Sequence, residues 1–169
     1  MIIWLNGAFG VGKSTVAEEM NRRLKESFIY DPEQAGYFLW DNFPEEMKRK
    51  GNFQHIPLWR EINYCVLKHI NDHYSGVVIV PMTIYIRQYY DEIAGRLLRY
   101  GVSISPFILC ASRQTIRNRL VVGRSDAEDG WGARHIDRCL DAFETDIPGD
   151  KIITDDKSVE EVAEENSDR

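Results

Sequence analysis

NGAFGVGKST, residues 6–15, stands almost at the beginning of the chain and decides its fold. Gly7 and Gly12 are five positions apart, and Lys13 and Ser14 follow directly, which is the G-x-x-x-x-G-K-[ST] spacing of a phosphate-binding loop. Glycines permit the backbone angles at which successive N–H groups point toward an anion. Lys13 adds a mobile cation for the β- and γ-phosphates, and the Ser14 hydroxyl is a hard oxygen ligand for Mg²⁺. The residues expected around the phosphates are Gly7, Ala8, Phe9, Gly10, Val11, Gly12, Lys13, Ser14 and Thr15.

The residues on either side of the loop support this interpretation. Residues 2–6, IIWLN, form a buried-strand run, and residues 13–26 place Val16, Met20 and Leu24 at helical spacing. Strand, loop and helix thus follow in the required order, and the helix N-terminus favours an anion. This context disfavours the alternative, an ordinary glycine-rich turn.

Strands and helices alternate along the rest of the chain. Apolar, β-branched runs predict strands at 27–33, 76–84, 105–111 and 151–155. Helices are expected at 56–74, 88–101, 113–122, 133–143 and 157–165, and Ser112 is expected to cap the third of these. The alternation predicts an α/β domain with a parallel sheet, helices on both faces, and ligands at the carboxyl ends of the strands.

Composition restricts the class of protein. The 169 residues, 43% hydrophobic and 28% charged, are typical of one globular domain. No apolar run approaches the roughly 20 residues of a membrane span, and the first strand begins where a signal peptide would stand, so we expect a cytoplasmic protein without an integral membrane segment. Residues 155–169 contribute −5 to the net charge of −6, so the acidity belongs to the last helix and the tail, 157–169. We expect no nucleic-acid partner, and a monomer or a homodimer.

Three classes of phosphate-loop protein are considered: a small-molecule kinase, a GTPase-type switch, and a nucleotide-dependent binding protein that transfers nothing. A switch places D-x-x-G after the third strand and N/T-K-x-D near the fifth. Here the third strand ends in PMTI, residues 81–84, and no N/T-K-x-D occurs. These absences disfavour the switch, so a kinase and a binding protein remain.

A carboxylate is expected at the end of the second strand. An ordinary ATPase holds its metal through an acid at the end of the third strand, and residues 77–83 contain none. Asp31 is the nearest candidate, because the end of a neighbouring strand can face both Mg²⁺ and the γ-phosphate. It would deprotonate an acceptor hydroxyl or ligate the magnesium shell, although an Asp before Pro32 also stabilises turns. Glu33 is a second candidate.

Six arginines bracket the segment SDAEDGWG, residues 125–132. A mobile lid, expected at about 119–135, would use them to neutralise the transferred phosphoryl group and to exclude water. A solvated helix face is the alternative for each of them. They are Arg113, Arg117, Arg119, Arg124, Arg134 and Arg138.

The acceptor pocket is expected over the second and third strand ends, with a helical region at about 34–74 as its wall. Thr83 follows the third strand. Arg60 begins a helix beside a large aromatic residue, where it would meet a polar or anionic acceptor, or pair with Glu61 or Glu45. The aromatic residues of this region either line the pocket or belong to the core: Tyr37, Phe38, Trp40, Phe43, Trp59 and Tyr64.

Several segments together resemble the tunicamycin-resistance proteins, ATP-binding relatives of the nucleoside-monophosphate, shikimate and chloramphenicol kinases. The resemblance rests on MIIWLNGAFGVGKS, YDPE, PLWR, VPMTI and the stretch from ASRQT through RHIDRC to ITDDKSVEEVAE, and it extends from residue 1 to about 165. It implies a three-layer α/β/α P-loop kinase-like domain whose five parallel strands are ordered 2-3-1-4-5. It also implies a helical acceptor region after the second strand and a lid after the fourth.

The resemblance further implies the positions of functional residues. Asp31 stands where the acceptor-orienting carboxylate of these kinases stands, Arg119 matches their first lid arginine, and Arg124 matches the second. The segment at 153–156 falls where relatives pass the adenine ring, so Asp155 is expected near the nucleotide. The expected catalytic residues are Lys13, Asp31, Arg119 and Arg124, and the expected acceptor-binding residues are Asp31, Glu33, Tyr37, Arg60 and Thr83.

The expected function is ATP- and Mg²⁺-dependent phosphoryl transfer to a hydroxyl of a small molecule. Because tunicamycin contains uridine, the expected acceptor is a nucleoside- or sugar-type compound or an antibiotic of that kind. The alternative is an ATP-binding protein that sequesters such an antibiotic without transfer.

Overall fold

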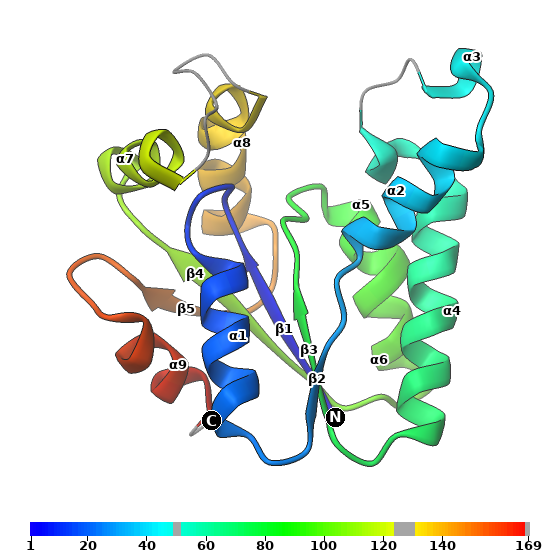
Figure 1. Cartoon of the computed structure of the whole chain (residues 1–169), viewed down its shortest axis with the longest axis horizontal. Helices are drawn as coiled ribbons and strands as arrows, with labels where there is room; N and C mark the ends of the chain where they lie inside the picture. The colour runs from blue at the N-terminus through cyan, green and yellow to red at the C-terminus, as the bar shows by residue number, and fades with distance from the viewer. Residues whose placement is uncertain (49–51, 124–130, 168–169) are drawn as a thin grey trace.

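A single parallel sheet organises the chain, of which the computed structural model describes residues 1–48, 52–123 and 131–167. In this part of the chain five strands lie in the order β2-β3-β1-β4-β5, and every pair is parallel (Figure 1). The strands are β1 (Ile2–Gly7), β2 (Ser27–Ile29), β3 (Val77–Pro81), β4 (Ile104–Cys110) and β5 (Asp150–Ile153). The predicted fold class and strand order are confirmed.

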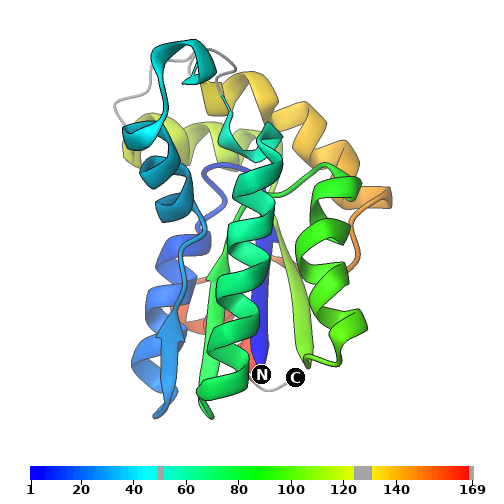
Figure 2. The same cartoon turned by 90° about the vertical axis from the view of Figure 1, so that its right-hand side faces the viewer.

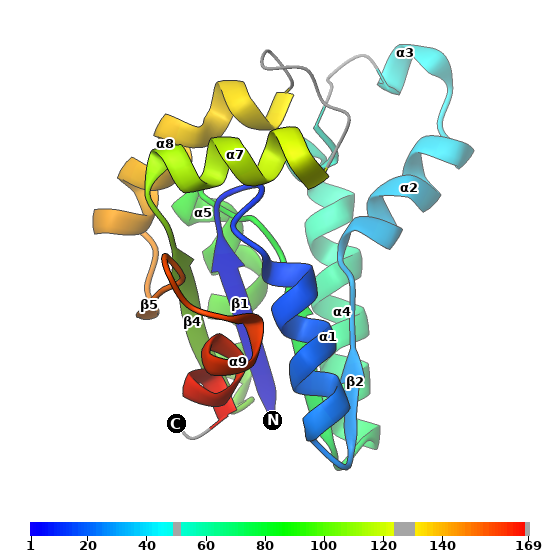
Figure 3. The same cartoon turned by 60° about the vertical axis from the view of Figure 1, so that its left-hand side comes forward.

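Helices cover both faces of this sheet. α1 and α9 pack together on one face, whereas α4 and the helix made of α5, η2 and α6 cover the other (Figures 1 and 3). On the first face lie α1 (Lys13–Arg23) and α9 (Val159–Ser167), and at the upper end of Figure 1 lie α7 (Arg113–Gly123) and α8 (Trp131–Thr145). The others are α2 (Glu33–Asn42), α3 (Glu45–Lys48), the 3₁₀ turn η1 (Phe53–His55), α4 (Pro57–His73), α5 (Arg87–Tyr90), the π-helical turn η2 (Asp91–Gly95) and α6 (Arg96–Tyr100).

Two strands are shorter than their sequence patterns predict. The β2 ladder ends at Ile29, because Asp31 turns the chain and its Oδ1 accepts the N–H of Glu33, at the first residue of α2. β3 stops at Pro81. The N–H of Met82 still donates to the oxygen of Leu5 on β1, but the N–H of Ile84 donates to the side chain of Asn6 instead of to the main chain of a neighbouring strand. In both places a side chain replaces the ladder, and strand propensity does not reveal such a substitution.

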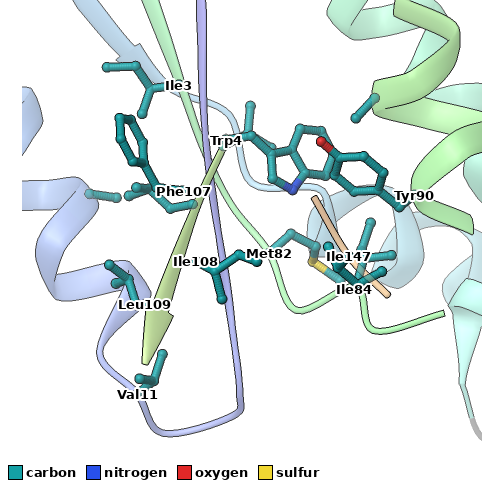
Figure 4. Packing of buried hydrophobic residues seen from close by; sticks show 14 of the residues in the cluster. Ile3, Trp4, Val11, Met82, Ile84, Tyr90, Phe107, Ile108, Leu109 and Ile147 are labelled. Carbon is teal, nitrogen blue, oxygen red and sulfur yellow. The ribbon is translucent and has the colours of Figure 1, made fainter. Parts of the chain in front are cut away.

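The core explains why β1 reads as an unbroken apolar run. All six of its residues are buried, since β3 pairs with one edge of the strand, β4 pairs with the other, and helices cover both faces. Trp4 lies edge-on to Tyr90, with ring centroids 5.9 Å apart, while Ile3 and Phe107 lie together on the opposite side of the strand (Figure 4). The strand that leads into the phosphate loop is therefore the most firmly held in the sheet.

The candidate site lies at the carboxyl edge of the strands, at the opposite end of the sheet from the two termini (Figure 2). The turn from β1 into α1 lies there, beneath α7 (Figure 3). Of the helices in the described part of the chain, none is both long and apolar enough to cross a membrane.

Candidate active site

The phosphate loop adopts a conformation that glycine makes possible. Gly7 and Gly12 have φ angles of 143° and 105°, in the region that disfavours side chains. A Cβ on Gly7 would also lie 2.7 Å from the carbonyl oxygen of Leu109 on β4. Gly12 faces open space and is followed directly by α1, so the first N–H groups of the helix lie at the loop.

Lys13 lies with its ammonium folded back over the loop. Its Nζ donates to the carbonyl oxygens of Gly7 and Ala8, at 3.0 and 2.9 Å, and lies 5.8 Å from the centre of the Phe9 ring. Main-chain oxygens are weaker partners for an ammonium than phosphate oxygens are. The side chain is thus held at the place where the loop would receive an anion.

A buried clasp, which the sequence analysis missed, fixes the start of the loop. The Oδ1 of Asn6 accepts the N–H groups of Gly7 and Ile84, at 3.0 and 2.9 Å, and its Nδ2 donates to the oxygen of Ile84 at 2.9 Å. Thr83 adds a second tie, because its hydroxyl donates to the oxygen of Gly7 at 2.8 Å. A polar residue at the end of an otherwise apolar strand run was the signal for this clasp, since buried amides need partners.

One cavity of about 550 Å³ joins the phosphate loop to the predicted residues on both of its sides. Asp31, Glu33 and Thr83 line it on the β2–β3 side, and Arg119 and Thr154 on the β4–β5 side. The loop residues that line it are Phe9, Gly10, Val11, Gly12, Lys13, Ser14 and Thr15, whereas Gly7 and Ala8 are buried beside it. Most of the predicted site therefore surrounds one space of the size of a ligand pocket.

On the β2–β3 side, Asp31 lines the cavity and also holds the start of α2. Its Oδ1 accepts from the N–H of Glu33 at 2.9 Å, and its Oδ2 from the side-chain amide of Gln34 at 3.0 Å. The indole N–H of Trp59, on α4, donates to the oxygen of Pro32 at 3.0 Å and holds the same turn from behind. Asp31 therefore both stabilises the turn before α2 and lines the cavity.

On the opposite side, Arg119 joins α7 to the loop and to the end of β5. Its Nη1 donates to the oxygen of Val11 and the hydroxyl of Thr154, at 2.9 and 3.0 Å, and its Nη2 to the oxygen of Thr154 at 3.0 Å. The guanidinium lies across the loop from Asp31, because β5 and β2 are the two opposite edges of the sheet. Arg119 and Thr154 thus form the wall of the cavity on the β4–β5 side.

Asp155, in the segment expected near the nucleotide, bonds through its side chain to the start of α7. Its carboxylate accepts from the N–H of Ser112 at 2.8 Å and from the hydroxyl of Thr115 at 2.5 Å. The Thr115 hydroxyl, foremost, holds the pKa of Asp155 below its usual value. Ser112 also accepts the N–H of Thr115, so the predicted cap of α7 is confirmed. The side chain of Asp155 stabilises the helix that presents Arg119, while Thr154, Lys157 and Ser158 line the cavity.

The prediction for Arg60 needs correction. Its side chain is buried and paired with Glu92, not with Glu61 or Glu45, and its guanidinium lies 4.3 Å from the centre of the Tyr89 ring. It borders a second, open groove between α4 and the helix of residues 87–100, outside the phosphate-loop cavity. The charge of Arg60 is paired within the protein because α4 and the turn that carries Glu92, distant in sequence, pack against each other.

The aromatic residues of the helical region divide into core and surface. Trp59 and Tyr64 are buried, and Trp59 packs on Phe53 with ring centroids 5.4 Å apart. Phe38 is exposed, and so is Tyr37, whose hydroxyl donates to Glu33 Oε2 at 3.1 Å. Tyr37 is thus not part of the cavity lining, but it bonds to Glu33, which is.

The predicted lid lies partly outside the described residues. Arg124 belongs to the segment at 124–130, and the side chain of Arg134 is likewise outside the description. Arg113 pairs with Asp137 at 2.7 Å and so joins α7 to α8, whereas Arg117 and Arg138 are exposed. Among the four of these arginines whose side chains the structure describes, Arg119 is the one that bonds to the loop.

Comparison with known proteins supports the resemblance inferred from the sequence. A scan of protein-family models finds no match, and a search of curated protein sequences finds none either. Among solved structures, the tunicamycin resistance protein of Deinococcus radiodurans is similar over 99% of this chain and 93% of its own, with a TM-score of 0.81 and 27% identity. This likeness extends through the whole chain, in fold and in sequence.

Other similar structures are kinases. A shikimate kinase from Bacteroides thetaiotaomicron is similar over 99% of this chain and 96% of its own, with a TM-score of 0.61 and 17% identity. The APS kinase CysC of Mycobacterium tuberculosis was solved in complex with AMPPNP and APS. It is similar over 99% of this chain and 95% of its own, with a TM-score of 0.62 and 15% identity. At such identities the likeness shows the fold alone, which is that of the P-loop kinases.

Proposed function

We propose that the chain is a phosphotransferase that binds ATP with Mg²⁺ at the phosphate loop and transfers the γ-phosphoryl group to a hydroxyl of a small molecule. The proposed acceptor is a nucleoside- or sugar-type compound, and tunicamycin is the first candidate because a tunicamycin resistance protein has the same fold and 27% identity. One observation supports transfer above all. A single cavity contains both the phosphate loop and Asp31, the carboxylate that follows β2.

The residues present fit a magnesium nucleotide. The glycine conformations leave the first N–H groups of α1 at the loop, and Lys13 lies beside them, which suits a polyphosphate. Ser14 lines the cavity with Asp31 and Glu33, and Mg²⁺ prefers hydroxyl, carboxylate and phosphate oxygens. The described residues contain no group of three or more His, Cys, Asp or Glu side chains that could hold a metal ion. The proposed ion therefore depends on Ser14 and the nucleotide phosphates.

We assign the protein's own groups to separate tasks within this proposal. The bound ion would neutralise charge on the β- and γ-phosphates. Lys13 would exchange its two main-chain partners for phosphate oxygens, and Arg119 would hold the loop on the nucleoside side. Asp31 would accept the proton of the acceptor hydroxyl as that oxygen bonds to the γ-phosphorus, while the bond from this phosphorus to the β-phosphate oxygen breaks and ADP leaves. Its Oδ atoms already accept two N–H groups, so the carboxylate is fixed in direction before the acceptor arrives.

Sequestration without transfer is the second candidate. The observation that favours it is the same pair of hydrogen bonds, because a carboxylate that caps α2 has a structural function without any catalysis. Under this interpretation nucleotide binding closes the cavity over the antibiotic, and Asp31 only helps to shape the pocket.

Label transfer decides between the two. The protein is incubated with Mg²⁺, γ-labelled ATP and a panel of nucleosides, sugars and antibiotics that includes tunicamycin, and the label is followed by chromatography and mass. Label on one panel member establishes a kinase and its acceptor. Intact ATP, together with tunicamycin binding that nucleotide strengthens, establishes sequestration. Absence of nucleotide binding contradicts both.

A further inference from the structure

A line of buried polar groups crosses the core between the helical region and the phosphate loop. Gln54 of η1, Thr83 after β3 and Arg60 of α4 are 3%, 2% and 6% exposed. Buried polar groups are costly unless they form hydrogen bonds. Each of these side chains donates to a main-chain oxygen, and together they link the segment at 54–60 to Thr83 and, through it, to Gly7.

The end of this line at the loop lies on Gly7. The side-chain amide of Gln54 donates through Nε2 to the oxygen of Thr83 at 2.8 Å, and the hydroxyl of Thr83 donates to the oxygen of Gly7 at 2.8 Å. The same oxygen of Gly7 accepts from Lys13 Nζ at 3.0 Å. When Lys13 turns to phosphate oxygens, the Thr83 hydroxyl keeps the carbonyl of Gly7 in place.

The other end of the line fixes the main chain of Gln54. Its oxygen accepts from Nη1 of Arg60 at 2.5 Å, and its N–H donates to the side chain of Asn52 at 2.9 Å. Arg60 is itself held by the carboxylate of Glu92, in the π-helical turn η2. Gln54 is therefore anchored to two helices through its backbone, which leaves its side chain to reach Thr83.

The two halves of the Gln54 amide are used unequally. Its Nε2 bonds to Thr83, but its Oε1 is buried without a hydrogen-bond partner among the described residues. An unpaired buried carbonyl is unfavourable, and an apolar side chain of the same length would avoid it. What the amide adds over such a side chain is the single bond to Thr83.

We propose that Gln54 is a positioning residue that couples the helical region to the phosphate loop through Thr83. Order in the segment at 53–60 and anion binding at the loop then favour each other, and thermodynamic linkage makes this coupling reciprocal. The nucleotide half of the proposal rests on the proposed function, whereas the hydrogen bonds do not.

Hydrogen exchange, read by mass spectrometry with and without Mg²⁺ and AMPPNP, tests this coupling. In the unmodified protein the nucleotide should slow exchange at residues 7–15 and also at 53–60. Gln54→Met, which keeps the length and removes the donor, should retain the first effect and lose the second. Thr83→Val, which removes only the hydroxyl, should do the same. Both variants should bind AMPPNP about three- to tenfold more weakly, the value of one buried hydrogen bond.

Tyr30→Phe is the matched control. It deletes a bond of the same kind, from the Tyr30 hydroxyl to Oδ1 of Asn63 at 2.8 Å, between the end of β2 and α4. Protection at 53–60 should survive in this variant. If Gln54→Met and Thr83→Val keep that protection, or if Tyr30→Phe loses it equally, the proposal is overturned. Should Gln54→Met fail to fold, Thr83→Val decides alone.

Failure of the proposed function gives a separate result. If the unmodified protein does not bind AMPPNP, the nucleotide assignment fails, and the comparison is made without ligand. Gln54→Met and Thr83→Val should then speed exchange at 7–8 and 82–84 relative to the unmodified protein and to Tyr30→Phe. Unchanged exchange at those residues overturns the proposal.

Discussion

The two sides of the phosphate loop are built from contacts of different range. On the proposed acceptor side, Asp31 bonds to Glu33 and Gln34, two and three residues away. On the proposed nucleoside side, Arg119 reaches Val11, 108 residues away, and Asp155 caps a helix that begins more than forty residues earlier. A local turn thus forms one wall of the cavity, and the other wall requires the finished sheet.

The largest expected effect concerns the acceptor side. Asp31→Asn should lower kcat about 10²- to 10⁴-fold if the carboxylate is the general base. Asn caps a helix about as well as Asp, so α2 and the affinity for Mg²⁺ and AMPPNP should stay nearly unchanged. Steady-state label transfer and calorimetric binding measure the two quantities. Glu33→Gln, beside it in the cavity, should cost less.

The same variant sharpens the choice between transfer and sequestration. In cells that carry Asp31→Asn, a transferase should lose protection against tunicamycin, whereas a sequestering protein should protect almost as before. Unchanged turnover of the purified variant would remove Asp31 as the base and leave only its function as a cap.

Lys13 lies at the loop between the two walls of the cavity, so its loss should affect the whole site rather than one wall. Lys13→Ala removes a charged donor and should weaken binding of Mg²⁺ and AMPPNP about 10- to 100-fold, the range for hydrogen bonds to charged groups. Calorimetric titration measures it, with Lys25→Ala, at an exposed position beyond α1, as control. Full nucleotide affinity in Lys13→Ala would contradict the whole assignment of the site.

A smaller effect is expected on the nucleoside side. Arg119→Met deletes three hydrogen bonds to Val11 and Thr154 and should reduce nucleotide affinity about tenfold, with acceptor affinity unaffected. Arg117→Met, on the exposed face of the same helix, is the control and should bind nucleotide normally. Equal losses in the two variants would mean that α7 as a whole, rather than the guanidinium, supports the nucleotide.

The range of the contacts also explains how much could be predicted from the sequence. The phosphate loop, the parallel sheet and Asp31 follow from local patterns: glycine spacing, apolar runs and a turn before a proline. The strand order and the match of Arg119 came from the resemblance to known kinases. Neither spacing nor periodicity reveals that Arg60 is neutralised by Glu92, 32 residues away, or that Asn6 clasps Ile84, 78 residues away. Those pairs depend on which helix reaches which strand end.

The smallest expected effect concerns Asp155, which holds the start of the helix that carries Arg119. The Thr115 hydroxyl and the Ser112 N–H hold the pKa of Asp155 below its usual value, so its ionised form stabilises the fold. Asp155→Asn should lower the free energy of unfolding at pH 7 by about 1 kcal/mol, because the amide carries no charge and offers one oxygen in place of the two that accept from Ser112 and Thr115. Because the folded-state pKa is depressed, this stabilisation is complete above the unfolded value of about 3.9 and is lost as the pH falls through the folded value. Urea unfolding of both proteins should therefore give stability curves that differ at neutral pH and converge in acid. A difference that persists at low pH would show that Asp155 acts on α7 through packing rather than through its charge.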